Sequence, residues 1–500
     1  MKNRLIYSIL AASLLVVGCS KDFLDPERNT NVLTSEDVAQ FSGINPALVA
    51  GTLDGIGSYM VEPLGVTGSG GSHYDLGQKG VDIWLDILSG DMALSANSYG
   101  WYQNTANLVT TVDYTRIENR IIWEYYYKII NISNNVIKSL GGNSATPELA
   151  STRHALGQAK AYRAYAYFYL AQIFQRSYDP TQPILPFYDG DVADPAKVPA
   201  SQIYDLIVSD LTQSVTYLDD FNRQFKHQID KNVAKGLLAY TYAAMGNYSN
   251  AKVLADDIIS TSGYPLTTKA ALAFPGVGSG FNDVNSPSWM WGYDITTEMG
   301  HQLLNWWGQM DYYTYSYAWA GDKKSIDNLL LASIPATDVR KSQFGSGGGT
   351  NRMPINKFFD PARVAGGQQT ITTDYIFMRI EEFYLLSAEA SAKSGDETTA
   401  KNRLKDLLTI RLSGGATAAD TYVNNLSGQG LKDAIYLQTK IEMWGEGKSY
   451  LALKRNKATV TRGTNHVFRS GGTFLYDIDE MSFQIPQSEL NNNSSITTQN

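Results

Sequence analysis

Apolar residues recur at three- and four-residue spacing over 232–263, on both sides of a short polar turn. The turn contains Gly246 and Asn247, residue types that favour the end of a helix. The pattern therefore predicts a helix, a tight turn and a second helix. Ala239 and Ala251 fall where two antiparallel helices would touch, so we expect a helical hairpin.

The hairpin pattern recurs elsewhere in the chain. Ala388 and Ala400 have the same separation as Ala239 and Ala251, and they also flank a turn that contains glycine. A third first helix is expected over 159–174, with its partner over 201–218. The pattern resembles the tetratricopeptide repeat, in which small residues let paired helices approach closely. It predicts a mainly α-helical, solenoid-like body with long insertions.

Outside the predicted hairpins the chain contains further helical segments and one long stretch without helical periodicity. We expect further helices over 80–94 and 116–140, the second being amphipathic with Trp123, Tyr127 and Ile130 on one face. Residues 267–373 lose helical periodicity and are rich in Gly, Trp and Tyr. The predicted division is a signal peptide (1–18), a lipidated tether (19–34), a helical repeat scaffold with loop insertions (35–266), an irregular aromatic-rich subdomain (267–373) and C-terminal helical repeats with a tail (374–500).

The N-terminus has the features of a targeting segment. Lys2 and Arg4 precede an apolar run that ends at Gly18 and Cys19, too short to cross a bilayer. The sequence Val-Val-Gly-Cys at 16–19 is typical of the lipobox of bacterial lipoproteins, in which the cysteine is acylated. The alternative is an ordinary cleaved signal peptide that happens to contain a cysteine. We expect Cys19 to be a lipid anchor that holds the protein on a membrane without crossing it.

Composition restricts the function classes. The chain of 500 residues is 43% hydrophobic and 18% charged, with a formal net charge of -8. This acidic balance argues against nucleic acid as a partner and provides no basic patch for anionic lipid. Because Cys19 is the only cysteine, disulfides within the chain, cysteine catalysis and cysteine-based zinc sites are excluded from the mature body.

No motif for catalysis, a metal or a cofactor stands out. The histidines do not form a metal-binding pattern, and neither a nucleophile elbow nor a phosphate-binding loop is complete. Glu381-Glu382 and Asp256-Asp257 are paired carboxylates of the residue type that glycosidases use. Neighbouring residues on a helix point in different directions, so we interpret both pairs as ion pairs or a solvated face. We therefore expect no enzyme activity and no cofactor.

The positive signal is aromatic: five of the nine tryptophans lie within 289–319. Flat rings pack against the C–H faces of sugars, while the tyrosine hydroxyl and tryptophan N–H still form hydrogen bonds. Trp289, Trp291 and Tyr293 alternate as a buried strand would, and we assign them to packing. We expect the rings from Tyr312 to Trp319 to be exposed, because polar residues separate them. The candidate ligand-binding residues in this segment are Trp306, Trp307, Tyr312, Tyr313, Tyr315 and Trp319.

Several motifs together resemble the SusD/RagB family of nutrient-binding outer-membrane lipoproteins. Cys19 is followed by the segment Lys-Asp-Phe-Leu-Asp at 21–25. A helix motif matches Arg379, Glu382, Tyr384 and Leu385, followed by the Ala-Glu-Ala run at 388–390. A second helix motif matches Glu442, Glu446-Gly447, Leu453 and Arg455. Near the end of the sequence, two short motifs match Ile485-Pro486 with Glu489, and Gln499-Asn500. The sequence departs from the family pattern at Gln438, Thr439 and Ala452.

This resemblance implies a right-handed superhelix of tetratricopeptide-like hairpins with an inserted, loop-rich ligand-binding subdomain. By analogy with the family, the loop that contains Asn97, Tyr99, Trp101 and Tyr102 is expected to form the second wall of the ligand site. It also implies a SusC-like, TonB-dependent outer-membrane transporter as partner, and a position on the cell exterior. The expected function is therefore capture of an oligosaccharide and its delivery to that transporter. Two alternatives remain: capture of an oligopeptide by a protein of the same family, or a tetratricopeptide-type scaffold that binds other proteins.

Overall fold

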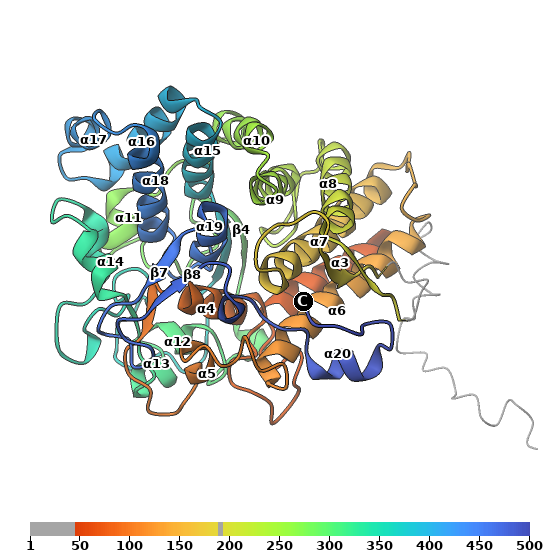
Figure 1. Ribbon diagram of the computed structural model, residues 1–500, viewed down its shortest axis with the longest axis horizontal. Helices are drawn as coiled ribbons and strands as arrows, with labels where there is room; N and C mark the ends of the chain where they lie inside the picture. The colour runs from red at the N-terminus through yellow and green to blue at the C-terminus, as the bar shows by residue number, and fades with distance from the viewer. Residues whose placement is uncertain (1–45, 189–193) are drawn as a thin grey trace, which may run out of the picture.

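The computed structural model describes residues 46–188 and 194–500, and its architecture is mainly α-helical, as predicted (Figure 1). Cys19, the signal peptide and the tether lie outside the described residues. Over the two described ranges, no helix combines the length and the apolar character needed to cross a membrane. The predicted division into segments stays a prediction, although every helix and strand between 267 and 373 is short.

The helices and strands alternate irregularly along the chain. The longer helices are α3 (Pro46–Val61), α4 (Gly77–Ser89), α6 (Ile117–Ser139), α7 (Ala150–Phe174), α8 (Ala200–Tyr217), α9 (Lys231–Ala244), α10 (Tyr248–Thr261), α15 (Glu381–Lys393), α16 (Glu397–Arg411), α17 (Gly415–Val423), α18 (Gly428–Glu442) and α19 (Ser449–Asn456). The short helices are α5 (Gln103–Ala106), α11 (Lys269–Ala273), η2 (Thr297–Met299), α12 (Trp307–Met310), α13 (Tyr317–Ala320), α14 (Asn328–Ser333), η3 (Val339–Gln343), η4 (Gly348–Thr350), η5 (Asp479–Met481) and α20 (Gln487–Asn492). The strands are β1 (Met92–Leu94), β2 (Pro183–Pro186), β3 (Lys197–Pro199), β4 (Trp289–Tyr293), β5 (Lys324–Ile326), β6 (Tyr375–Arg379), β7 (Thr459–Thr461) and β8 (Thr473–Leu475).

The hairpin predicted at 232–263 is confirmed as α9 and α10, which pack together. Asp230 caps α9 by accepting a hydrogen bond from the Val233 amide at 2.9 Å, which satisfies an N–H that has no partner within the helix. Gly246 adopts a φ of +78°, the left-handed conformation that lets the chain turn after α9. Ala239 and Ala251 are fully buried, so their small side chains allow close helix packing.

The other two predicted hairpins are also confirmed. Helix α15 packs on α16, with Asp396 capping α16, and α7 packs along α8. Successive helices from α6 to α10 each contact the next, and α10 also packs on α15. Figure 1 shows α8, α9, α10 and α15 side by side along the upper edge of the molecule. Tyr162, Tyr165 and Tyr169 of α7 are buried, as expected of scaffold residues.

The strands form four two-stranded antiparallel pairs, β1–β5, β2–β3, β4–β6 and β7–β8, within the described residues. In β4–β6, Trp289 pairs with Arg379 and Tyr293 with Tyr375, and all five residues of β4 are buried. The assignment of Trp289, Trp291 and Tyr293 to packing is therefore confirmed. In β1–β5, Leu94 pairs with Lys324. This second pair brings the segments after residue 94 and before residue 324 together.

A buried network of ion pairs joins β6 to the C-terminal helices. Arg379, Arg340 and Arg411 each place a guanidinium nitrogen 2.8–3.1 Å from Glu442, and Arg379 also contacts Glu446 at 2.9 Å. Three arginines around Glu442 hold the pKa of its carboxyl well below the usual value, despite complete burial. The charged motif residues therefore contact one another inside the scaffold.

The paired carboxylates are confirmed as members of ion pairs. Glu381 lies 3.1 Å from Arg411 and Glu382 lies 3.6 Å from Lys448, and both carboxylates are buried. Asp256 contacts Arg403 at 2.8 Å, and Asp257 pairs with Lys235. A solvated face is wrong for Glu381 and Glu382, because both side chains are buried.

Candidate ligand-binding site

The two aromatic segments named as candidates meet at α13. Tyr317 of α13 contacts Tyr99 and Trp101 edge to face, with ring centroids 5.4 Å and 5.6 Å apart. On the same short helix, Trp319 lies against Tyr315 with centroids 5.5 Å apart. Figure 1 shows α5, α12 and α13 together at the lower edge of the molecule. We name the rings of Tyr99, Trp101, Tyr315, Tyr317 and Trp319 the α13 ring cluster.

Asp322 joins the loop at 97–102 to α13. Its buried carboxylate accepts hydrogen bonds from the backbone N–H of Tyr99 at 2.7 Å and of Trp101 at 3.1 Å. The β1–β5 pair brings Asp322 and the loop close together, because Asp322 comes two residues before β5 and the loop begins three residues after β1. One carboxylate therefore fixes the orientation of two candidate rings.

Three rings of the cluster are open to solvent. Tyr99 is 59% exposed, Tyr315 45% and Trp319 38%. Trp319 is partly covered by the turn at Gly366, where a φ of +61° and the absence of a side chain let the backbone lie against the indole. Exposed rings fixed by a turn present a flat surface without losing much conformational entropy on binding.

Trp101 and Tyr317 are the less exposed rings of the cluster, and Tyr317 packs against the exposed Tyr99. His73 stacks on Trp101 with centroids 4.7 Å apart, and its Nδ1 forms a hydrogen bond with the Tyr317 hydroxyl. Burial lowers the pKa of His73, which favours a neutral imidazole at this position. Trp101 is half-buried, whereas Tyr317 is 9% exposed, so the expectation that Tyr317 is exposed is wrong.

Three candidate residues are buried and offer no accessible ring face: Tyr102, Trp306 and Trp307, each exposed by 1% or less. Trp306 packs edge to face against Trp307 and Phe358, and the ammonium of Lys79 lies 4.6 Å from its ring centre. Tyr102 packs between Tyr74 and Trp84. Their selection as accessible ligand-binding residues is therefore corrected: the apolar rings of this region fill the core beneath α13.

Tyr312, Tyr313 and Asn97 are half-buried and already engaged within the protein. Arg363 donates a hydrogen bond to the Tyr313 hydroxyl at 2.8 Å and stacks its guanidinium over the same ring. Asn97 accepts from the Gly100 amide at 3.0 Å and donates to Gln103, so its side chain stabilises the loop. Their contact with ligand stays a prediction.

Asp311 holds the segment that precedes α13. Its buried carboxylate accepts hydrogen bonds from the Tyr313 amide at 3.0 Å, the Thr314 hydroxyl at 2.8 Å and the Asp360 amide at 3.0 Å. Burial nevertheless raises the pKa of Asp311 to about 7. The sequence analysis did not identify Asp311, Asp322 or His73, because each acts through partners that are distant in sequence or in irregular loops.

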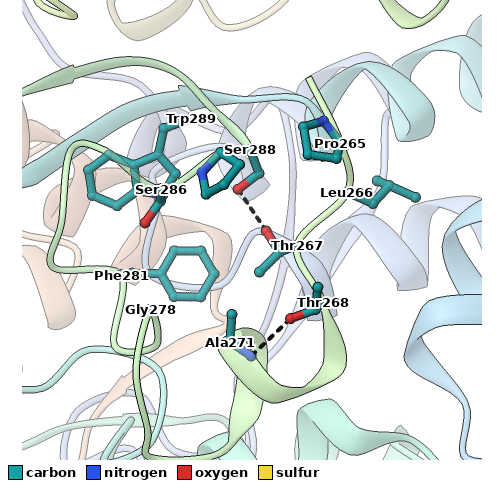
Figure 2. A pocket seen from close by; sticks show the side chains of 11 residues that line it. Pro265, Leu266, Thr267, Thr268, Ala271, Gly278, Phe281, Ser286, Ser288 and Trp289 are labelled. Atoms are coloured by element: carbon teal, nitrogen blue, oxygen red, sulfur yellow. Dashed lines mark hydrogen bonds between the residues drawn. The ribbon is translucent and has the colours of Figure 1, made fainter. Parts of the chain in front are cut away.

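A separate apolar cavity lies between β4 and α11. It has a volume of about 240 Å³ and is bordered by Phe281, Trp289 and Leu266 (Figure 2). Three of its hydroxyls are engaged within the protein: Thr267 donates to Ser288 at 2.8 Å, and Thr268 caps α11. The exposed α13 ring cluster is better suited to an amphipathic ligand such as a sugar than this apolar cavity is, so we place the candidate site at the cluster.

Family models match two segments of the chain. A model described as "SusD family" matches residues 312–500, and one described as "Starch-binding associating with outer membrane" matches residues 80–243. No curated protein matches the chain in sequence.

Solved structures share the fold over nearly the whole chain. A SusD-like carbohydrate-binding protein from Bacteroides vulgatus is 23% identical with a TM-score of 0.75, and the alignment covers 91% of this chain and 97% of that one. A SusD superfamily protein from Bacteroides thetaiotaomicron is 20% identical with a TM-score of 0.73, covering 91% and 99%. A third, from Bacteroides fragilis, is 23% identical with a TM-score of 0.70, covering 91% and 99%.

Proposed function

Because the chain is a SusD-like protein, we propose that it captures oligosaccharides at the cell surface through the α13 ring cluster. The observation that carries this proposal is the set of exposed rings, Tyr99, Tyr315 and Trp319, fixed on two segments that Asp322 ties together. Such rings stack on the apolar face of a sugar, and the neighbouring hydroxyl and amide groups bind its hydroxyls. The role is binding, not catalysis.

The proposal extends to the partner and the location of the protein. A lipid on Cys19 would hold the body on the outer membrane, facing the cell exterior, and a SusC-like, TonB-dependent transporter would receive the captured glycan. The description of one matching family, starch binding in association with the outer membrane, supports this placement. Binding of oligopeptides or of other proteins is the competing function that the experiment must exclude.

Substitution of Trp319 tests the site. We expect the wild-type protein to bind members of an oligosaccharide panel and not a peptide panel. Trp319→Ala or Tyr315→Ala should weaken that binding by about tenfold or more. Stacking of a nucleic-acid base on an exposed ring contributes about 1–3 kcal/mol, and we expect a loss of similar size for a sugar face. Isothermal titration calorimetry measures the affinity. Thermal unfolding should be nearly unchanged, because the Trp319 ring contributes little to the core.

Two control variants make the comparison specific. Tyr114 is exposed by 38%, the same fraction as Trp319, and lies beside Gln487 near α20, so Tyr114→Ala should bind normally. Trp123 is 3% exposed, as expected of its helix face, and Trp123→Ala should cost roughly 3–5 kcal/mol of stability. Binding to peptides alone, or normal glycan affinity in Trp319→Ala and Tyr315→Ala, would contradict the proposal.

A further inference from the structure

A second pocket opens beside the α13 ring cluster, between the β1–β5 pair and the turn that follows β7. Its volume is about 370 Å³. The residues that line it are Ser95, Lys323, Gly348, Gly349, Asn351, Arg352, Thr464, Asn465, His466 and Val467. Neither the proposed glycan site nor the family comparisons assign a role to it.

Backbone pairing places this pocket next to the rings. The Ser95 amide donates to the Lys323 carbonyl at 2.8 Å, and the Lys323 amide donates to the Ala96 carbonyl at 2.9 Å. Asp322, the residue before Lys323, holds Tyr99 in the cluster. Four residues of chain span at most about 14 Å, so Ser95 in the pocket lies within that distance of Tyr99. One short oligosaccharide can therefore contact both.

The pocket is basic in an acidic protein. Its lining includes the cations Lys323 and Arg352 but no aspartate or glutamate, although the chain carries a net charge of -8. The Asp327 carboxylate, behind the lining, lies 3.2 Å from His466 and also accepts hydrogen bonds from the amides of Leu330 and Gly463. Asp327 is therefore occupied by its own neighbours.

Arg352 is the cation available to a ligand. Among the described residues its guanidinium has no hydrogen-bond or ion-pair partner, whereas the ammonium of Lys323 donates to the Gly349 carbonyl. The Arg352 backbone adopts a φ of +61°, which is uncommon for a residue with a side chain. Two backbone hydrogen bonds hold this conformation. The Arg352 amide donates to the Gly345 carbonyl at 2.8 Å, and the Arg352 carbonyl accepts from the Ile326 amide at 3.0 Å. Residues kept in such conformations are found preferentially at functional sites.

We propose that the captured glycan is acidic, and that Arg352, assisted by Lys323, binds its anionic group while the α13 ring cluster stacks on its sugar rings. This inference rests on the proposed function and specifies the class of substrate. A guanidinium binds carboxylate or sulfate through paired N–H donors, and the two groups share this chemistry. The pocket therefore distinguishes charged from neutral oligosaccharides.

The experiment uses paired probes on the folded protein. Each uronic-acid oligosaccharide is compared with its own carboxyl-reduced, neutral form, and each sulfated oligosaccharide with its desulfated form. We expect wild-type protein to prefer an acidic form by about tenfold or more at low salt, the ratio that one charge-assisted hydrogen bond provides. The preference should decrease at high ionic strength, where exposed charges are screened.

Substitutions identify the residue responsible. In Arg352→Gln the affinity for the acidic form should fall to that for the neutral form, and Arg352→Lys, which keeps the charge, should restore part of the preference. Lys432 of α18 is half-buried and has no role in the pocket, so Lys432→Gln should keep the full preference. Thermal unfolding confirms that each variant is folded.

The outcomes separate the two proposals. Equal affinity for acidic and neutral forms, or an unchanged preference in Arg352→Gln, overturns the inference and leaves glycan capture standing. Binding to no oligosaccharide at all overturns both. A preference for only the uronate or only the sulfated probes supports the inference and identifies the anionic group.

Discussion

Single buried carboxylates position the loops of the candidate site. Asp322 accepts two backbone N–H groups from the loop at 97–102, and Asp311 accepts two backbone N–H groups and one hydroxyl around the segment at 311–314. An irregular loop has no regular backbone partners, so a side-chain acceptor must satisfy its amides. Loss of either acceptor should loosen the rings that the loop carries.

Asp311 also makes stability depend on pH. Burial raises its pKa from 3.8 to about 7 in the folded protein, so the native state retains a proton that the unfolded chain releases. The contribution of Asp311 to the free energy of unfolding is therefore fully present below about pH 4 and is lost as the pH rises through about 7. Its full size is at most about 4 kcal/mol, since each pKa unit corresponds to 1.36 kcal/mol.

The corresponding experiment measures chemical unfolding between pH 4 and 8. Asp311→Asn does not titrate, so its stability should decline less over this range than that of the wild type. Burial likewise raises the pKa of Asp374 to about 7, so Asp374→Asn should further reduce the decline of the free energy of unfolding with pH. If the free energy of unfolding of Asp311→Asn declines with pH as steeply as that of the wild type, Asp311 does not titrate in this range.

The accessibility of individual rings could be predicted only in part from the sequence. The mixture of polar and aromatic residues from 312 to 319 correctly indicated exposure of Tyr315 and Trp319, because local polarity reflects contact with water. Trp306 and Trp307 lie in an equally irregular stretch, yet Phe358 and Lys79 cover them. Those partners lie more than forty residues away, so no local pattern could reveal the burial.

At the scale of elements, the helical hairpins were predictable and the strand pairs were not. Hairpins such as α9–α10 depend on apolar periodicity and a glycine turn within about thirty residues. The β1–β5 pair joins residues more than two hundred positions apart, and each strand has only three residues. Such short segments carry too little periodicity to be recognised. The aromatic composition indicated the segment at 312–319, and the loop at 97–102 was expected only from the family resemblance. The junction of the two segments at Asp322 required the structure.

Ala251 provides a test of hairpin packing. It is fully buried on α10, which packs against both α9 and α15, so the larger side chain of Ala251→Leu should overpack the contact and destabilise the protein by roughly 1–3 kcal/mol. Urea unfolding measures the change. Val253, on the same helix, is 64% exposed, and Val253→Leu should change stability by less than about 0.5 kcal/mol. Equal midpoints for the two variants would argue against close packing at Ala251.

At the scale of the whole molecule, buried charge connects the C-terminal helices to strand β6. Glu442 at the end of α18 contacts Arg379 of β6, Arg340 of η3 and Arg411 of α16. Removing one partner from such a buried network leaves an uncompensated charge, which is strongly unfavourable. The α13 ring cluster and the basic pocket therefore belong to a body whose helices and strand β6 are joined by buried ion pairs.

The last prediction concerns attachment of the protein to the membrane through Cys19. The lipobox makes Cys19 the expected site of acylation, and two or more acyl chains give stable membrane attachment at about 0.8 kcal/mol per buried CH₂. Cys19→Ala should therefore appear in the soluble fraction after cell lysis and still bind glycan with normal affinity, because the rings and the basic pocket lie in the described body. Asn29→Ala, a substitution in the same polar tether, should stay with the membrane. The comparison is made in cells that lack the proposed SusC-like transporter, because binding to such a transporter would also retain the protein at the membrane. If Cys19→Ala still sediments with the membranes of these cells after high-salt washing, attachment does not depend on a lipid at this cysteine.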